Sequence, residues 1–306
     1  MKAFNFDFMR WRLAAGIGSG LAILVSIGTL GFSGLNFGLD FTGGTLVEVG
    51  YPRAVLPNEV RVQLQGAGFN NAVVQNFGTE QDLLIRVPSR PEIDQATLGD
   101  EIQTLLRDVE PEMEVRRSEF VGPAVGAELR ETAGLAMLVA LGAVMLYIMF
   151  RFTGKFSIGA VTALIHDVVL TLGMFAIFRW TFDLAVLAAV LAVIGYSLND
   201  TIVVSDRIRE NFRKVRRGGA VEVINRSLNQ MLGRTLVTSL TTLMVLVALL
   251  LFGGELIRGF AIALIIGVVV GTYSSIYVAS SMLMVMGVTR EDLIVPEKEG
   301  LQDDVP

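Results

Sequence analysis

Residues Asp183–Arg209 read DLAVLAAVLAVIGYSLNDTIVVSDRIR and decide the class of fold. The first two-thirds of the stretch is an apolar run long enough to enter a bilayer, and Asn199 and Asp200 follow before the run ends. A carboxylate that faces lipid costs about 2.5–3.5 kcal/mol on insertion scales, so Asp200 is expected to face protein or water. Such a residue predicts a carboxyl group that takes up and releases protons, and a structural Asp hydrogen-bonded to a neighbouring helix is the alternative.

The composition predicts an α-helical multi-pass membrane protein. The 306 residues are 52% hydrophobic and 18% charged, with the apolar residues gathered in long runs. Six runs reach the roughly 18 apolar residues that indicate a membrane-spanning helix. They are Leu13–Phe32, Ala133–Phe150, Phe156–Phe178, Leu184–Val204, Thr235–Phe252 and Phe260–Met286. The chain has no cysteine, so no disulfide is expected. His166 is the single histidine, so neither a metal site nor the Ser-His-Asp triad of an enzyme is expected away from this residue.

The distribution of Lys and Arg predicts the orientation in the membrane. These residues gather before the first span, between the second and third, and in a basic loop at residues 205–234 that alone holds eight. The loops on the opposite side hold one each, Arg179 and Arg258. Both termini and the basic loop are therefore expected in the cytoplasm, with residues 33–131 outside. This outer segment has sixteen Asp/Glu and eight Lys/Arg, so it has no excess of positive charge that would retain it in the cytoplasm.

The outer segment is expected to form a small α/β domain. Strand-like stretches at 45–51, 72–78, 82–87 and 113–120 alternate with helical patterns at 57–66 and 93–109. The order β-α-β-β-α-β suggests a ferredoxin-like sandwich. The predicted organisation is residues 1–32 for the N-terminus and first span, 33–131 for the outer domain, 132–286 for five further spans, and 287–306 for an acidic cytoplasmic tail that is expected to be disordered.

The stretch GLDFTGGT at residues 38–45 predicts a tight structural turn after the first span. Gly43 and Gly44 permit positive φ angles and close backbone approach, and Gly38 and Asp40 complete the turn. A phosphate-binding loop is the alternative for such a glycine-rich segment. No Lys-Ser/Thr follows the glycines, and the segment is expected outside the cytoplasm, away from ATP.

Other polar residues interrupt the apolar spans. His166 and Asp167 lie near the middle of the third span, where either a working proton site or buried helix–helix hydrogen bonds would explain them. Arg234 opens the fifth span as an interfacial anchor or as the counter-charge of a bundle carboxylate. A polar stripe continues its face, at Thr238, Thr241 and Thr242.

Two further patterns concern packing. An amphipathic stretch between the fourth and fifth spans is expected to lie along the inner membrane surface, with its apolar face made by Val221, Ile224, Leu228 and Met231. Its basic charges favour anionic lipid rather than nucleic acid. Small residues at every fourth position of the sixth span predict close contact with another helix backbone. They are Gly259, Ala263, Gly267, Gly271, Ser275 and Ala279.

Five motifs resemble the SecF branch of the SecD/SecF family, part of the resistance-nodulation-division (RND) superfamily and of the bacterial Sec protein translocase. They are GLDFTGGT (38–45), FVGPAVGAEL (120–129), IHD (165–167), GYSLNDTIVVSDRIREN (195–211) and NQMLGRTLVTSLTT (229–242). Members look like half of an RND bundle: one span, an outer domain, then five spans. The fourth motif is highly specific by its length, and the resemblance covers nearly the whole chain.

The resemblance implies a non-enzymatic accessory subunit of the bacterial inner membrane that uses the proton-motive force to help draw preprotein out on the periplasmic side. It implies SecD as the partner that supplies six more spans, with SecYEG, SecA and often YajC as associates and protons as the coupling ion. The family's membrane carboxylate falls on Asp200 and its membrane arginine on Arg234. Asn199, Asp167 and His166 complete the predicted proton relay. A proton-coupled small-molecule exporter of the RND type and a structural scaffold of the translocon are the alternatives.

Overall fold

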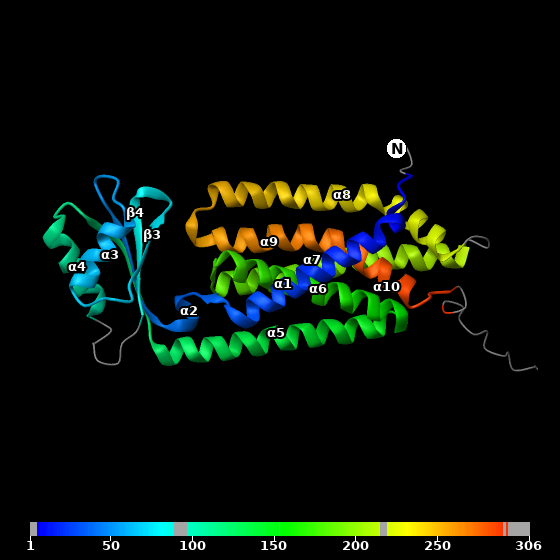
Figure 1. Ribbon diagram of the computed structural model, residues 1–306, viewed down its shortest axis with the longest axis horizontal. Coiled ribbons are helices and arrows are strands. Elements are labelled where there is room, and N and C mark those ends of the chain that lie inside the picture. The colour runs from blue at the N-terminus through cyan, green and yellow to red at the C-terminus, as the bar shows by residue number, and fades with distance from the viewer. Residues whose placement is uncertain (1–4, 89–96, 153, 215–218, 290–291, 293–306) are drawn as a thin grey trace, which may run out of the picture.

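The computed structural model describes residues 5–88, 97–152, 154–214, 219–289 and 292. They form a long helical bundle with a small α/β domain at one end (Figure 1). The predicted tail, 287–306, and the expected helical residues 93–96 lie mostly or wholly outside the described residues.

Six helical stretches among the described residues are long and apolar enough to cross a membrane. They are α1 (Arg12–Phe32) after the short helix η1 (Phe8–Trp11), α5 (Pro123–Arg151), α6 (Gly154–Phe178), α7 (Leu184–Lys214), α8 (Ala220–Phe252), and α9 (Glu255–Ser274) continued by the π-helical η2 (Ser275–Ala279) and α10 (Ser280–Val285). The six predicted spans are therefore confirmed. Helices α6 and α7 are the most buried, whereas α1 and α5 leave most of their surface exposed.

The stripe of small residues brings α9 against α7, as the sequence predicts. A Cβ atom on Gly259 would lie 2.9 Å from the side chain of Val186, and one on Gly271 would lie 3.0 Å from the Cβ of Ser197. A side chain at either position would therefore push the two helices apart. Since Asp200 follows Ser197 by one turn of α7, this close packing brings the residues after Gly271 to the carboxylate.

The domain outside the bundle has the predicted ferredoxin-like fold. Its elements are β2 (Gly44–Gly50), α3 (Pro57–Gly66), β3 (Val73–Phe77), β4 (Thr79–Val87), α4 (Leu98–Val109) and β5 (Glu114–Val121). The strands form an antiparallel sheet in the order β3-β4-β2-β5. Helices α3 and α4 cover the face of the sheet that is turned away from the bundle (Figure 1). The core lies between sheet and helices, with Val47, Leu64, Ile85 and Ile102 at 0–1% exposure.

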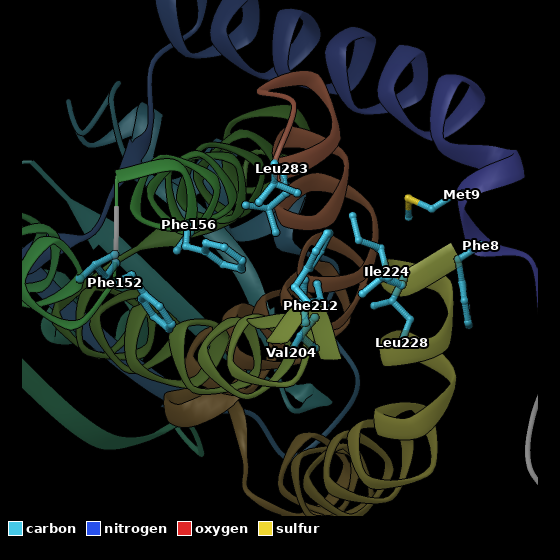
Figure 2. Packing of buried hydrophobic residues seen from close by; sticks show 14 of the residues in the cluster. Phe8, Met9, Phe152, Phe156, Val204, Phe212, Ile224, Leu228 and Leu283 are labelled. Atoms are coloured by element: carbon cyan, nitrogen blue, oxygen red, sulfur yellow. The ribbon is translucent and has the colours of Figure 1, made fainter. Parts of the chain in front are cut away.

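The structure corrects the predicted basic loop and shows what the apolar residues of the predicted amphipathic helix contact. Residues 205–214 continue α7, and α8 begins already at Ala220, so residues 205–234 are helical over most of their described length. Figure 2 shows Ile224 and Leu228 of α8 beside Phe8 and Phe212, in a buried cluster. Two residues of the predicted apolar face, Ile224 and Leu228, therefore pack on protein, whereas Val221 is exposed. The sequence predicted an amphipathic helix correctly but could not show which partner covers its apolar side.

The segment before α1 is bound to the same end of α8. The Asn229 side chain pairs with the Phe6 backbone, because its Oδ1 accepts from the Phe6 N–H at 2.7 Å and its Nδ2 donates to the Phe6 carbonyl at 2.8 Å. Asn225 Oδ1 accepts from the Met9 N–H at 3.0 Å, and its Nδ2 donates to Asp7 at 2.7 Å. These bonds fix the start of the first span to the start of the fifth.

Candidate functional site

Asp200 lies inside the bundle, where α7, α8 and η2 meet. Thr235 of α8 donates its hydroxyl to Oδ1 at 3.1 Å, and Ser275 of η2 donates to Oδ2 at 2.7 Å. Only 9% of Asp200 is exposed, so its carboxyl group faces protein and not lipid, as expected. Each carboxylate oxygen thus accepts one hydroxyl hydrogen bond from a different neighbouring helix.

A second buried carboxylate, Asp167 of α6, lies close to the first. Its Oδ1 is 2.8 Å from Nδ1 of His166, and its Oδ2 accepts hydrogen bonds from Ser274 at 2.7 Å and from Ser197. Nε2 of His166 is 3.2 Å from the Ser19 hydroxyl of α1. The partners of this pair, invisible in the sequence, thus come from three other helices.

The two carboxylates belong to one connected network. Ser274 and Ser275 are consecutive residues, one bonded to Asp167 and the other to Asp200. Ser197, which also bonds to Asp167, lies on the helix that carries Asp200. The polar interior therefore joins α6, α7, α8 and the α9–η2 junction.

The other two predicted relay residues are not part of this interior. Arg234 and Asn199 are both exposed. Among the ion pairs of the described residues none joins Arg234 to Asp200, although the next residue of α8, Thr235, contacts the carboxylate. Arg207 of α7 pairs with Glu210 at 2.6 Å, not with Asp200. Asp200 therefore accepts hydrogen bonds from two hydroxyl groups and forms none of the ion pairs found among the described residues, whereas Asp167 contacts two hydroxyl groups and the imidazole of His166.

The glycine-rich turn joins the outer domain to the start of α7. It contains the short helix α2 (Leu39–Thr42), preceded by strand β1 (Asn36–Phe37), which pairs in parallel with β6 (Thr181–Phe182). Asp40 Oδ2 accepts from the Leu184 N–H at 3.0 Å, and the Gly38 N–H donates to the Phe182 carbonyl at 2.8 Å. The turn thus caps the helix that carries Asp200.

Gly43 needs both properties that glycine offers. Its φ is 69° and its ψ 168°, a region almost restricted to glycine. A Cβ atom there would lie 2.9 Å from Cα of Pro123, where α5 begins. Gly126 of α5 completes this contact, since a Cβ on it would lie 2.8 Å from the Gly43 nitrogen. Gly44 has φ 127°, so the backbone of both central glycines supports the predicted tight turn.

A half-buried arginine of the outer domain, Arg86, lies at the same joint. Arg86 of β4 donates through Nη1 to the Phe37 carbonyl at 3.4 Å. Burial lowers the pKa of its guanidinium, and the nearby carboxylates of Asp183 and Asp40 partly oppose this shift. Burial raises the pKa of Asp183, and Asp40 adds to that effect. The joint therefore holds one cation between two acidic groups at the N-terminus of α7.

Comparison with known proteins gives the family. The family described as "Protein export membrane protein SecD/SecF, C-terminal" matches residues 101–289, and the "SecD/SecF GG Motif" matches residues 28–51. The chain belongs to the SecD/SecF family of protein-export membrane proteins. The matched GG motif contains the turn that caps α7, and the other match contains both buried carboxylates.

SecF proteins are similar to this chain over its whole length. "Protein translocase subunit SecF" of Vibrio alginolyticus is 49% identical over 99% of this chain and 97% of its own. The protein of the same name from Pseudomonas aeruginosa is 48% identical over 100% of this chain and 99% of its own. These matches fit a chain with one span, one outer domain and five further spans.

Two solved SecDF structures resemble the fold. The crystal structure of SecDF, a translocon-associated membrane protein from Thermus thermophilus, has a TM-score of 0.82 and 38% identity over 92% of this chain. SecDF in a super-membrane-facing form has a TM-score of 0.69 and 39% identity over the same share. This chain spans 39% of the length of either SecDF chain.

The site is built from two carboxylates, one imidazole and several hydroxyl groups. Within the described part of the chain, no group of three or more His, Cys, Asp or Glu residues is placed to hold a metal ion. Sequence reasoning located Asp200, Asp167 and His166, but it missed Thr235, Ser197 and Ser274 and treated Ser275 only as a packing residue. A serine or threonine in an apolar helix is a weak signal by itself, because its hydroxyl often bonds to its own backbone.

Proposed function

We propose that this chain acts with SecD to complete protein export across the bacterial inner membrane, driven by the proton-motive force. Membership of the SecD/SecF family supports the role in export. This chain matches 39% of the length of a SecDF chain, which supports SecD as the partner that supplies the rest of the bundle. Both termini are cytoplasmic in this proposal and residues 33–131 periplasmic, in keeping with the Lys/Arg distribution.

The observation that carries the proposal is the buried Asp200 carboxyl group, which among the described residues accepts hydrogen bonds from the hydroxyls of Thr235 and Ser275. Moving one charge across the membrane potential releases about 2.3 kcal/mol per 100 mV. When Asp200 gains or loses a proton, its hydrogen bonds to Thr235 of α8 and Ser275 of η2 change. A helix arrangement with two states of similar energy can be shifted by a free energy of this size.

The joint at the other end of α7 provides a route from this event to the outer domain. Asp40 binds the first turn of α7, and Gly43 lies against α5. A shift of α7 relative to its neighbours therefore acts on the segment that connects α1 with β2. In this proposal the outer domain moves and helps draw the preprotein outward, with SecYEG, SecA and YajC as the associated translocase components.

Arg234 and Asn199 are proposed to face the partner half of the bundle. Both are exposed on this chain. An exposed Arg one residue before Thr235 would be costly against lipid unless it reached the membrane surface, a partner or water. SecD supplies such a partner in the proposed complex.

The test compares Asp200→Asn with Asp206→Asn in the complex with SecD, reconstituted into vesicles. Asp206 lies on the same helix, but its exposed carboxylate pairs with Arg151 at 2.6 Å. Proton flux and completion of preprotein export are measured under an imposed proton gradient. Asp200→Asn is expected to lose both activities while the complex stays assembled, and Asp206→Asn is expected to keep them.

Wild-type proton flux and export in assembled Asp200→Asn would refute the proton role and favour a scaffold. Extrusion of small molecules without any effect on preprotein would favour an RND-type exporter. Absence of SecD from material purified with this chain out of its native membrane would remove the partner on which the proposal depends.

A further inference from the structure

Two consecutive serines bridge the two buried carboxylates. Ser274, the last residue of α9, donates to Asp167 at 2.7 Å, and Ser275, the first residue of η2, donates to Asp200 at 2.7 Å. Both serines are 0% exposed. Side chains of consecutive helical residues point about 100° apart, so one short segment reaches α6 and α7 at the same time.

Each hydroxyl has a second acceptor one turn back on its own helix. Ser274 Oγ is 3.1 Å from the Gly271 carbonyl oxygen, and Ser275 Oγ is 3.0 Å from the Thr272 carbonyl oxygen. A serine carries a single O–H, so it donates either to the carboxylate or to the carbonyl. An ionised carboxylate accepts the hydrogen. A protonated carboxyl group can instead donate its own hydrogen to Oγ, which frees the serine hydrogen for the carbonyl.

The serines lie where the α-helix changes into a π-helix. The Ser275 N–H donates to the Gly271 carbonyl, the same oxygen that the Ser274 hydroxyl can approach. At the far side of the π segment, Ser280 Oγ donates to the Ser275 carbonyl at 3.3 Å. Single π turns within helices often mark functional sites. A change of hydroxyl partner therefore acts on the bonds that hold the junction.

We propose that Ser274 and Ser275 are positioning residues that couple the protonation of Asp167 to the protonation of Asp200. The inference rests on the proposed proton-driven function and extends it from one carboxyl group to two. When one aspartate gains a proton, its serine turns toward the helix backbone and shifts the junction. The neighbouring serine and its aspartate are displaced with it, so the two groups do not titrate independently.

The positions of the other ionisable groups distinguish coupling through the serines from a direct electrostatic effect of those groups on both aspartates. His166 bonds to Asp167 on the side away from the serines. The titratable or charged side chains within four residues of Asp167, Asp200, Thr235, Ser274 or Ser275 along these elements are His166 on α6, Tyr196 on α7, Arg234 on α8, Tyr273 on α9 and Tyr277 on η2. None of them bonds to both aspartates among the described residues, whereas the serine pair contacts both.

The test is infrared spectroscopy of the reconstituted complex with SecD while the pH is changed. Asp167→Asn and Asp200→Asn assign the carboxyl C=O bands of the two groups. Ser275→Ala is expected to raise the frequency of the Asp200 band, because a hydrogen-bond partner is lost, and to shift the pH midpoint of the Asp167 band. In Ser274→Ala the two aspartates exchange roles: the frequency of the Asp167 band is expected to rise and the pH midpoint of the Asp200 band to shift.

Two variants control for altered packing. Ser281→Ala removes a buried hydroxyl that has no hydrogen-bond partner within the described part of the chain, and it should leave both bands unchanged. Ser275→Cys keeps a side chain of similar size with a weaker donor and should lie between wild type and Ser275→Ala. Each variant is first checked for assembly with SecD.

The possible results separate the inference from the proposed function. If Ser275→Ala changes only the Asp200 band and leaves the Asp167 midpoint at its wild-type value, the coupling is refuted while proton binding stands. The same follows if Ser281→Ala shifts both midpoints as much. If Asp200→Asn removes no titrating band, Asp200 binds no proton, and the proposed function fails together with the inference.

Discussion

Replacing Gly43 with alanine should weaken the joint between the outer domain and the bundle. Alanine at this position would have to adopt the backbone conformation φ 69° and ψ 168°, which costs a residue other than glycine about 1–3 kcal/mol. It would also lie 2.9 Å from Cα of Pro123, and overpacking of this kind typically costs about 1–3 kcal/mol. Together the two effects cost about 2–6 kcal/mol, a large part of the 5–15 kcal/mol that stabilises a typical protein.

Two matched alanine variants separate these effects. Gly78 has φ 81°, and a Cβ there would meet nothing within 4 Å, so Gly78→Ala reports backbone strain alone, about 1–2 kcal/mol. Gly126 lies in α5, where alanine is favoured by about 1 kcal/mol, but its Cβ would lie 2.8 Å from the Gly43 nitrogen. Gly126→Ala therefore reports the close approach, reduced by the better helix propensity.

The free energy of unfolding would be measured in mixed micelles with increasing SDS, using tryptophan fluorescence. Trp180 lies at the joint, immediately before β6, and stacks on Phe178 with ring centroids 4.7 Å apart. Gly43→Ala should be destabilised more than either control. Equal loss in Gly43→Ala and Gly78→Ala would mean that the contact with Pro123 carries no cost, and a stabilised Gly126→Ala would mean that the two segments are not tightly packed.

Two further predictions concern the joint and the helix contact. Arg86→Ala should destabilise the protein by about 1–3 kcal/mol, because the half-buried carboxylates of Asp40 and Asp183 lose a nearby cation. Since burial raises the pKa of Asp183, its charged form opposes folding above that pKa. Asp183→Asn or mild acidification should therefore restore part of the loss in the same unfolding assay. Gly267→Leu should prevent stable folding, because its side chain would overlap Val193 of α7, whereas Gly195→Leu, with open space around its Cβ, should fold. Size-exclusion chromatography compares the two variants, and a folded Gly267→Leu protein would show that the α7–α9 contact is loose.

The spans were predictable because the cost of exposing charges to lipid acts on each residue separately. Hydropathy therefore located all six helices. It gave poorer boundaries for α7, which continues ten residues beyond the predicted end at Val204. Outside the apolar run, Glu210 bonds to Arg207 at 2.6 Å and to Lys214 at 2.5 Å, and such pairs at spacings of three and four stabilise a helix in water. An apolar run measures the thickness of the membrane, whereas the helix ends where its own side-chain pairs and packing end.

The site was predictable only in part. The burial of Asp200 followed from its cost in lipid, but its partners depend on which helices touch, and that is set by packing. Ser275 belongs to the stripe of small residues and also donates to Asp200, so one position serves both close contact and hydrogen bonding. Arg234 has the charge expected of a partner, yet the helix directs it outward and turns Thr235 to the carboxylate.

Hydroxyl partners for Asp200 fit the proposed function, in which this carboxyl group changes its proton at every cycle. Breaking a buried ion pair by removing one partner costs about 3–5 kcal/mol, because a charge is left uncompensated. A hydrogen bond to a charged group contributes about 1.5–3 kcal/mol, which is close to the 2.3 kcal/mol that one charge gains over 100 mV. Each bond to Asp200, from Thr235 or from Ser275, is therefore comparable to the electrical energy of one proton, whereas the two together, about 3–6 kcal/mol, exceed it. In the proposed function, one proton thus exchanges a single hydroxyl bond at Asp200 and does not release the carboxylate from both helices at once.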